Sequence, residues 1–567
     1  MGCILAEEEF RIQEGKFPNL KKICILFRVA LVWKSLFEKS ILQGVIMNPW
    51  FFFLALFFSC FQLYSNTFTW NSAAVISNSG VDVSDPQVVI DPSGNITAVW
   101  LENGVLQSSV QPFGGSWSTP VAVTGSGASS PALGIDGSGN ATAVWILGDV
   151  VQTSTLPLNG SWDSSTTLSD TGAVTPAIAV DSSGNAVVAW QRNGFIESKT
   201  RFSGNWGLVY MLSAQNSDPP DVAISDGGTA VVVWHSVISG VDTIVASTSI
   251  VGSTWSNPVN LTSPSVNALQ PRVAIDSHGN GTAVWFQYDK PLSAYTKVQV
   301  FASSLQSNTG NWTVPVAISD TGSRNPNELP LALSSDANGN AVAVWSNSPD
   351  GAIFNVETSQ LQSGSSWAAS VAILGGSYYA VALDLAVSPD GQALVAAMSS
   401  DQPSSGAITL VTQNSYIAGY LQEYWSGPQT VSSGSDNGYP VVATSVSGTQ
   451  VNGTALWLSY NGTNIELQAV AGTKPLIDPP SNLAVQQVQN SFGVYSDYSN
   501  ILTWTPSSAQ NIVSYVIYRN GVYVTRVEDM SNMLVDHNDV VGGPVTYGVA
   551  TLDNTGGQSQ TIYISYP

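Results

Sequence analysis

The sequence predicts an all-β protein: one small antiparallel sheet is repeated many times, and a separate β-sandwich follows it. Three observations lead to this prediction. Gly, Ser, Thr, Asn, Val and Trp are abundant, with 44% hydrophobic and only 10% charged residues. A two-part motif recurs through residues 69–472, and the pattern changes after a Pro-rich stretch at 473–478. The hydrophobic content is enough for a large core, so the low charge does not indicate disorder.

The N-terminal region, residues 1–65, contains an uncharged stretch at 45–64, VIMNPWFFFLALFFSCFQLY, which is long enough to span a bilayer. It is interpreted either as a signal peptide that starts at Met47 and is cleaved near Ser65, or as an uncleaved anchor of a chain that starts at Met1. We favour the cleaved signal. The protein is therefore expected to be secreted or on the cell surface, with membrane contact only through 45–64 if that segment is retained.

Charge and cysteine content exclude several classes of function. The chain has 17 basic and 39 acidic residues, a formal net charge of −22. Neutralising nucleic-acid phosphates needs a basic patch, so no nucleic-acid partner is expected. The three cysteines, Cys3, Cys24 and Cys60, all precede the repeats. The folded part is therefore expected to have no disulfide, thiol nucleophile or Cys-based metal site.

The first half of the motif is an apolar run, a D-x-x-G-N turn and a second run that ends in Trp. Its clearest copies are PQVVIDPSGNITAVW (86–100), PALGIDGSGNATAVW (131–145), PAIAVDSSGNAVVAW (176–190), PDVAISDGGTAVVVW (220–234) and PRVAIDSHGNGTAVW (271–285). Weaker copies lie at 331–345, 383–398 and 440–457. In the turn, Asp91 can hydrogen-bond the backbone ahead and Gly94 can adopt positive φ.

The second half of the motif is a short W-x-x-P-V-x-V strand, such as SWSTPVAVT (116–124), and it also occurs eight times. Each period therefore contains four short strands, for the first one VVI (88–90), ITAVW (96–100), VLQSSVQ (105–111) and the W-x-x-P segment. Four antiparallel strands about every 45 residues indicate the blade of a β-propeller.

One copy of the fourth strand, TWNSAAVIS (69–77), stands alone before the first complete repeat, and the last repeat lacks its own. The two ends of the repeat region are therefore expected to pair and close the ring, which removes free sheet edges. The count predicts an eight-bladed propeller over 69–472, with seven blades as the alternative because the last three copies are weak.

The D-x-x-G-N turn followed by A-V-W, and the G-x-S/N-W-S-x-P strand, resemble secreted bacterial propellers of the sialidase-like or BNR-like kind. These motifs are structural and specify the fold more than an activity. Residues 479–567 resemble a fibronectin type III domain: they open with PPSNLAV (479–485), continue with ILTWTPS (501–507) and YVIYRNG (515–521), and place Tyr547 late in the domain. That resemblance implies an immunoglobulin-like β-sandwich after the 473–478 linker.

No catalytic, cofactor-binding or metal-ligating residue is predicted. The closing Trp residues recur in nearly every repeat, which favours packing between blades over stacking on sugars. The repeated Asp91, Asp136, Asp181, Asp276 and Asp336 have no second carboxylate in their turns, so turn capping is favoured over calcium binding. His235, His278 and His537 have no partner at zinc spacing.

A sialidase-like enzyme would need a cluster of arginines. The ring contains Arg192, Arg201, Arg272 and Arg324, and no convergent set is visible in the sequence. Glu is too scarce for an evident pair of glycosidase carboxylates.

The sequence therefore predicts a non-enzymatic binding or adhesion protein with an extracellular protein or glycan partner, bound by the insertions at 288–310 and 401–424. A carbohydrate-active, sialidase-like enzyme and a structural envelope-layer component are the alternatives.

Overall fold

The computed structural model describes residues 68–566 except for short internal segments. These segments are 289–296, 323–329, 348–353, 390, 403–404, 413–424, 426–428, 433–436, 449, 493–494, 509–511, 521, 529–530, 538–544, 554–558 and 560. The predicted signal or anchor at 45–64 lies outside the described residues. Within them, no helix is long and apolar enough to cross a membrane.

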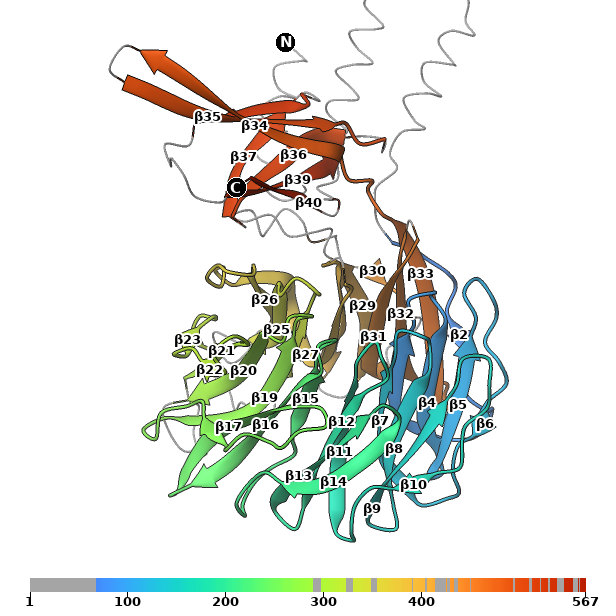
Figure 1. Ribbon diagram of the computed structural model, residues 1–567. Coiled ribbons are helices and arrows are strands. Elements are labelled where there is room, and N and C mark those ends of the chain that lie inside the picture. Colours follow the sequence, from blue (N-terminus) through green and yellow to red (C-terminus); the bar gives the residue numbers. More distant parts are fainter. Residues whose placement is uncertain are drawn as a thin grey trace, which may run out of the picture. The chain divides into compact units, whose positions relative to one another are not determined.

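The first five repeats each form a separate antiparallel sheet, here sheets 1 to 5 (Figure 1). Sheet 1 contains β3 (Val83–Ile90), β4 (Ile96–Glu102), β5 (Val105–Gln111) and β6 (Val121–Ala122). Sheet 2 contains β7 (Ala128–Ile135), β8 (Ala141–Leu147), β9 (Val150–Leu156) and β10 (Thr166–Thr167). Sheet 3 contains β11 (Ala173–Val180), β12 (Ala186–Arg192), β13 (Phe195–Phe202) and β14 (Asn205–Met211). Sheet 4 contains β15 (Asp221–Ile224), β16 (Thr229–Ile238), β17 (Val241–Ile250) and β18 (Val259–Asn260). Sheet 5 contains β19 (Asn267–Ile275), β20 (Gly281–Tyr288), β21 (Val298–Gln306), β22 (Asn311–Trp312) and β23 (Val316–Ala317).

The remaining repeats are joined into one twelve-stranded sheet for two reasons. β27 pairs with β26 along its first half and with β28 along its second half, and β29 pairs with β31 at Gly406 and Asn437. Its strands are β24 (Leu331–Ser335), β25 (Ala341–Asn347), β26 (Phe354–Leu361), β27 (Val371–Val387), β28 (Ala393–Gln402), β29 (Ser405–Thr412), β30 (Gln429–Thr430), β31 (Asn437–Ser447), β32 (Gln450–Tyr460), β33 (Ile465–Pro475), β1 (Thr69–Trp70) and β2 (Ala74–Val75).

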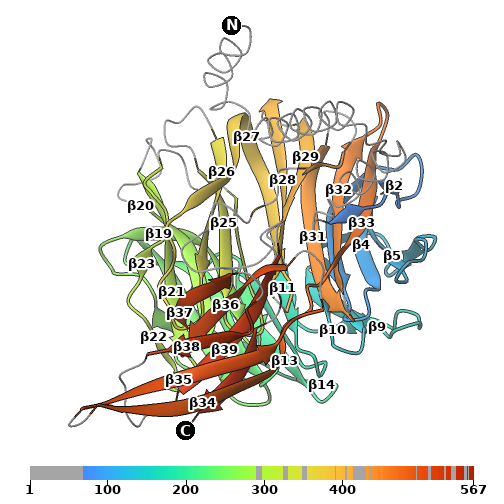
Figure 2. The ribbon, with the colours of Figure 1, turned by 90° about the horizontal axis from the view of Figure 1, so that it is seen from above.

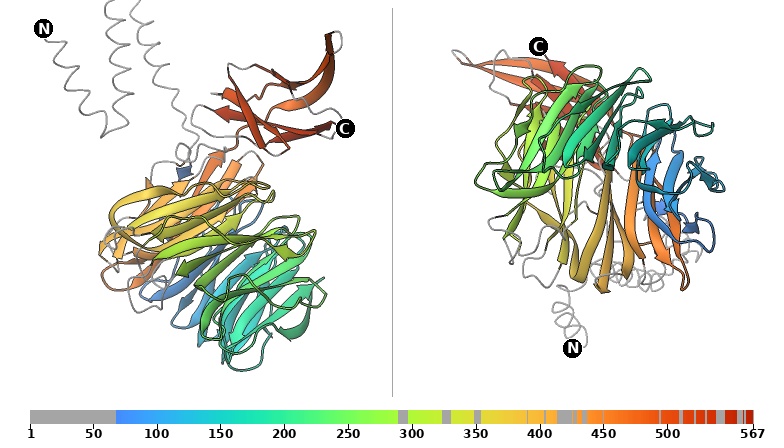
Figure 3. Two further views of the ribbon diagram at one scale, coloured as in Figure 1. Left: turned by 90° about the vertical axis from the view of Figure 1, so that its left-hand side faces the viewer. Right: turned by 90° about the horizontal axis from the view of Figure 1, so that it is seen from below.

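The first strands of successive repeats contact one another in a closed series, from β3 through β7, β11, β15, β19, β24, β27 and β31 back to β3. Figures 2 and 3 show the sheets side by side, with the first sheet (blue) beside the last strands of the ring (orange). The second strands, such as β4, are buried on both faces because a neighbouring sheet covers each side. The all-β class is confirmed, and the arrangement is that of a β-propeller.

The closing Trp residues pack between sheets, as predicted. Trp100, Trp145, Trp190, Trp234, Trp285, Trp345 and Trp457 are all fully buried. The D-x-x-G-N turns are capped as predicted. Asp91 Oδ1 accepts hydrogen bonds from the N–H groups of Ser93 and Asn95, both at 2.8 Å, and Oδ2 accepts from Asn95 Nδ2 at 2.7 Å. Asp136, Asp181, Asp276 and Asp336 make the same three bonds.

The lone fourth strand pairs with the end of the repeat region. Thr69 is opposite Thr473 and Trp70 is opposite Gly472 in the antiparallel pair of β1 and β33, and β2 extends the pairing to Ala469 and Gln468. Segments about 400 residues apart therefore close the series by hydrogen bonding, which leaves no open edge at this junction.

Gly472 is the tightest point of this closure, so a side chain there is expected to destabilise the protein. A Cβ at Gly472 would lie 2.5 Å from the Trp70 ring and 2.8 Å from the Thr69 carbonyl oxygen. We expect Gly472→Val to lower the free energy of unfolding by about 1–3 kcal/mol, the usual cost of overpacking. Gly125→Val is the matched control, since nothing lies within 4 Å of its Cβ position. Equal thermal midpoints for the two variants would contradict this role of the closure.

The C-terminal residues form two further antiparallel sheets. One contains β34 (Ser481–Phe492), β35 (Tyr495–Thr505) and β38 (Met533–Asp536), in the order β34-β35-β38. The other contains β36 (Ile512–Arg519), β37 (Val522–Glu528), β39 (Val545–Asp553) and β40 (Ile562–Tyr566), in the order β37-β36-β39-β40. Trp504, Tyr515 and Tyr547 are buried in one core cluster.

Candidate functional site

The strand order gives every sheet of the ring two distinct ends. The first strand starts and the second strand finishes at one end, here the loop end. The D-x-x-G-N turns lie at the opposite end, here the turn end. Residues just before a first strand and just after a second strand therefore gather at the loop end, although they are far apart in the sequence.

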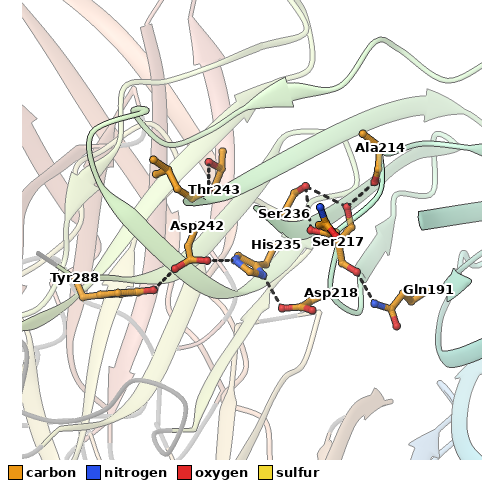
Figure 4. A network of polar contacts seen from close by, with 11 residues as sticks. Gln191, Ala214, Ser217, Asp218, His235, Ser236, Asp242, Thr243 and Tyr288 are labelled. Atoms are coloured by element: carbon orange, nitrogen blue, oxygen red, sulfur yellow. Dashed lines mark hydrogen bonds and ion pairs between the residues drawn. The ribbon is translucent and has the colours of Figure 1, made fainter. Parts of the chain in front are cut away.

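A chain of polar side chains lies at the loop end of sheets 4 and 5 (Figure 4). The imidazole of His235, which follows the buried Trp234 on β16, lies between two carboxylates. Its Nδ1 is 2.6 Å from Asp218 Oδ2, and its Nε2 is 3.0 Å from Asp242 Oδ1. Asp218 precedes β15 and Asp242 belongs to β17, so three segments of sheet 4 supply the three side chains.

Sheet 5 adds a fourth member. The hydroxyl of Tyr288, at the end of β20, donates a hydrogen bond to Asp242 Oδ2. Tyr288 is almost completely buried. Burial and the neighbouring Asp242 carboxylate both raise the pKa of the Tyr288 phenol, so this group remains a hydrogen-bond donor at neutral pH.

Asp218 is the most exposed member of this chain of side chains, and Tyr288 is the most buried. The relative exposure of the side chain is 11% for His235, 28% for Asp242 and 64% for Asp218. A neutral imidazole donates from one nitrogen only, yet both nitrogens of His235 face a carboxylate. The imidazole therefore links Asp242 to Asp218, and Asp218 is the member most exposed to solvent. This arrangement can perform general acid–base chemistry at one exposed carboxylate.

The backbone around Asp218 holds that carboxylate in place. The Asp218 N–H donates to the His235 carbonyl oxygen at 2.9 Å, and Gln191 Nε2 from sheet 3 donates to the Ser217 carbonyl oxygen at 2.5 Å. Pro219 and Pro220 follow directly and restrict the backbone after Asp218. Asp218 therefore sits on a constrained segment despite its exposure.

A second charged group lies on the first strands of the ring. Three charged residues, Asp221, Arg272 and Asp384, occupy the same position in their repeats. Each lies three residues before the turn-end residue that finishes its first strand, β15, β19 or β27. Asp221 Oδ2 accepts from the Val273 N–H and Asp384 Oδ2 accepts from the Val442 N–H, both at 2.9 Å, so each carboxylate links two neighbouring repeats. Burial raises the pKa of both carboxyls, that of Asp384 to about 6, and the positive charge of Arg272 offsets only part of this effect.

The raised pKa of Asp384 predicts a specific pH dependence of stability. The carboxyl has an ordinary pKa of 3.8 and a folded-state pKa of about 6, so the folded protein binds the proton more tightly than the unfolded chain. This contribution to stability is complete below the unfolded value and is lost as the pH rises through about 6. As the pH rises from 3.8 to about 6, we expect the thermal midpoint of the Asp384→Asn variant to fall less than that of the wild type. Midpoints that stay parallel at every pH would contradict the assignment.

The other described residues weighed in the sequence belong to neither charged group. Arg192 forms an ion pair with Glu197 at 2.5 Å. Arg201 donates to Thr142, Thr155 and the Gly184 carbonyl oxygen. His278 lies in the D-x-x-G-N turn of sheet 5 and His537 lies near Ser499 in the C-terminal part. Among the described residues, no group of three or more His, Cys, Asp or Glu side chains could hold a metal ion. Arg324 lies outside the described residues.

The two predicted recognition insertions, 288–310 and 401–424, both begin at the loop end, where β20 and β28 finish. Each contains a regular strand of the ring, β21 in the first and β29 in the second. Residues 289–296, 403–404 and 413–424 lie outside the described residues.

The sequence analysis missed both charged groups. It judged His235 by the spacing of metal ligands along the chain, whereas Asp218 and Asp242 reach it across strands. It also found no convergent arginine, whereas Arg272 lies near two carboxylates. One signal in the sequence could have revealed the second charged group. The position of the repeat that holds Asp221, Arg272 and Asp384 is uncharged in the other copies, where it holds Gln87, Ala132, Ala177, Ala332 and Val441.

No protein-family model matches the chain, and no curated protein is significantly similar to it. Solved structures with a similar fold include an ulvan lyase of polysaccharide lyase family 25, with 11% identity, 71% of this chain and 95% of that chain covered, and a TM-score of 0.39. They also include a Hadza microbial sialidase, with 14% identity, 68% and 74% coverage and a TM-score of 0.33. The WD40 domain of SCAP from fission yeast has 10% identity, 73% and 98% coverage and a TM-score of 0.39.

These neighbours are β-propeller proteins, and at such identities the likeness concerns the fold alone. Two of the three are enzymes by name, so this fold also occurs in enzymes and gives no ground for the expectation that this chain is not one. That expectation was drawn from the lack of a catalytic pattern in the sequence. It is corrected here, since an acid–base cluster can be assembled from residues on separate strands. The predicted adhesion role has no support.

Proposed function

We propose that this protein is a carbohydrate-active enzyme that cleaves glycosidic linkages at the loop end of sheets 4 and 5. The observation that carries the proposal is the line of hydrogen bonds from buried Tyr288 through Asp242 and His235 to exposed Asp218. Asp218 is the candidate catalytic residue. His235, Asp242 and Tyr288 are positioning residues.

In this proposal protonated Asp218 donates its proton to the glycosidic oxygen as the C–O bond to the anomeric carbon breaks, and water then adds to that carbon and returns a proton to the carboxylate. In the eliminative alternative, ionised Asp218 removes the proton from the sugar carbon next to a uronic acid carboxyl, and the bond to the leaving oxygen breaks to give an unsaturated product while that oxygen takes up a proton from water. In both cases the imidazole of His235 fixes the orientation of the carboxylate and stabilises its charged form. Asp242 fixes the imidazole, and the Tyr288 hydroxyl fixes Asp242. Such support from a second layer of hydrogen bonds is what keeps a proton-transfer group in a reactive geometry.

We also propose finer assignments of architecture and location. The ring is an eight-bladed propeller over 69–472, supported by the eight first strands in the closed series. Residues 479–567 form a fibronectin type III domain, supported by the sheet orders β34-β35-β38 and β37-β36-β39-β40. The protein is exported, supported by the apolar stretch at 45–64.

The activity is tested with residues 66–567 incubated with a panel of neutral and uronic-acid-containing polysaccharides. New reducing ends report hydrolysis, and ultraviolet absorbance of unsaturated products reports elimination. We expect one polysaccharide class to be cleaved by the wild type and not by the Asp218→Asn variant. Cleavage of none of them would contradict the proposal.

A further inference from the structure

A groove at the turn end, between sheets 1 and 2, has the character of a ligand site. Its cavity volume is about 480 Å³. Side chains from both sheets line it, among them Thr97, Ser109, Ser118, Leu156, Leu158 and Trp162. Trp162 lies in SWDSSTTLS (161–169), a copy of the second half of the motif without its Pro, as Trp206 lies in NWGLVYMLS (205–213). The indole of Trp162 is only partly buried, unlike those of the closing Trp residues.

The equivalent groove between sheets 2 and 3 shows what such a site accepts, because a side chain of the protein reaches into it. The Arg201 guanidinium lies 5.5 Å from the centre of the Trp206 ring. It donates to Thr155 Oγ1 at 3.1 Å and to Thr142 Oγ1 at 3.0 Å. A polar group therefore lies against the indole and hydrogen-bonds to hydroxyls on the neighbouring sheet.

The first groove has similar walls without this filling group, although Val110 stands where the second groove has Thr155. Leu156 occupies in sheet 2 the position that Arg201 occupies in sheet 3. Leu156 pairs with Ala141 and Arg201 pairs with Ala186, and each alanine is the first residue of the second strand of its sheet. In the same register, Thr97 corresponds to Thr142. The motif places Trp162 where Trp206 stands. The shorter, apolar Leu156 leaves the space beside Trp162 open.

The groove is neutral and rich in hydroxyl and amide groups. Among the described residues that line it, Asp91 is the one acidic or basic side chain, and both its oxygens accept hydrogen bonds from its own turn. An anionic ligand is disfavoured by Asp91 and by the net charge of −22. A sugar ring suits these walls, because its C–H face can pack on an indole while its hydroxyls meet hydroxyl and amide groups.

We propose that the groove between sheets 1 and 2 binds one pyranose ring of a neutral saccharide, with Trp162 as the stacking wall. This site is separate from Asp218 and His235, which lie at the loop end of sheets 4 and 5. A groove of similar size, about 470 Å³, lies between sheet 5 and the following repeat, but no aromatic side chain is among the described residues that line it. The proposal therefore singles out the groove that contains Trp162.

The test measures binding of methyl β-glucopyranoside, methyl β-galactopyranoside, methyl α-mannopyranoside and N-acetylglucosamine by saturation-transfer NMR and calorimetry, with methyl β-glucuronide as the anionic control. We expect at least one neutral sugar to bind the wild type at one site. Leu156→Arg copies the filled groove and is expected to weaken binding at least tenfold, as is Trp162→Ala. Trp162→Phe should retain part of the affinity and serves if Trp162→Ala does not fold.

The reverse change tests the equivalence of the two grooves. Arg201→Leu is expected to open the second groove and raise the stoichiometry from one site to two. His235→Gln and Asp218→Asn should bind the sugar as the wild type does, which separates this site from the proposed catalytic one. The proposal is overturned if no neutral sugar binds, if Leu156→Arg binds unchanged, or if Arg201→Leu gains no site.

Discussion

Replacing His235 with Gln is expected to reduce the rate of glycosidic cleavage by about 10²-fold to 10³-fold, the range for loss of an effective acid–base arrangement. The amide side chain cannot carry and release a proton as the imidazole does. It also cannot bond both Asp218 and Asp242 as His235 does, through Nδ1 at 2.6 Å and Nε2 at 3.0 Å. The measurement is the initial rate on the polysaccharide that the wild type cleaves best.

A pH profile separates this positioning role from a structural one. If His235 orients and polarises Asp218, the pH of half-maximal rate should move in His235→Gln, and the thermal midpoint should move little. His278→Gln is the matched control, because His278 lies in the D-x-x-G-N turn of sheet 5 at the turn end. A lower rate with an unchanged pH profile and a lower thermal midpoint would show that His235 supports the fold only. Tyr288→Phe should give a smaller loss in the same direction, since it removes one donor to Asp242.

The largest loss of stability is expected from Glu197→Ala, at about 3 kcal/mol. The Glu197 side chain is 5% exposed and accepts from Arg192 and from the Trp190 indole N–H, the latter at 3.0 Å. Its removal leaves a buried indole N–H without an acceptor and an arginine without its partner. Arg192 is 25% exposed, so water compensates part of the cost.

Sheet 2 provides the matched control for this change. Gln152 pairs with Trp145 as Glu197 pairs with Trp190, and within the described residues its side-chain oxygen has no hydrogen-bond partner. Gln152→Ala is therefore expected to cost much less in a urea or thermal unfolding series. Comparable losses in the two variants would show that the Glu197 bonds add little to stability. Glu197→Gln should fall between them because the amide can still accept one bond.

The repeat made much of the ring predictable. The D-x-x-G-N turn and the closing Trp each follow from local chemistry: a carboxylate that caps its own turn, and an indole that is buried between adjacent sheets. The pairing of 69–75 with β33 could also be predicted. The last repeat lacks its fourth strand, and an extra copy of that strand stands before the first complete repeat. The merging of the later repeats through β27 could not, because those copies are weak and their boundaries irregular.

The candidate site was not predictable in the same way. Asp218, His235, Asp242 and Tyr288 come from the ends of different strands, and only the register of sheets 4 and 5 brings them together. The saccharide groove depends on changes at equivalent positions, Leu156 in place of Arg201 and Val110 in place of Thr155. The fully buried Trp residues were the candidates for sugar contact in the sequence, whereas the structure places Trp162, of the second half of the motif, at the cavity between sheets 1 and 2.

The most direct test of the account is the cleavage rate of Asp218→Asn beside that of Asp85→Asn. Asp85 is also exposed and lies at the loop end of sheet 1, where Leu101 occupies the position of His235 and the Asp85 carboxylate bonds Ser84. The account predicts a loss of about 10²-fold to 10⁴-fold in Asp218→Asn and a wild-type rate in Asp85→Asn. Equal, undiminished rates in both variants would contradict the assignment of the chemistry to Asp218.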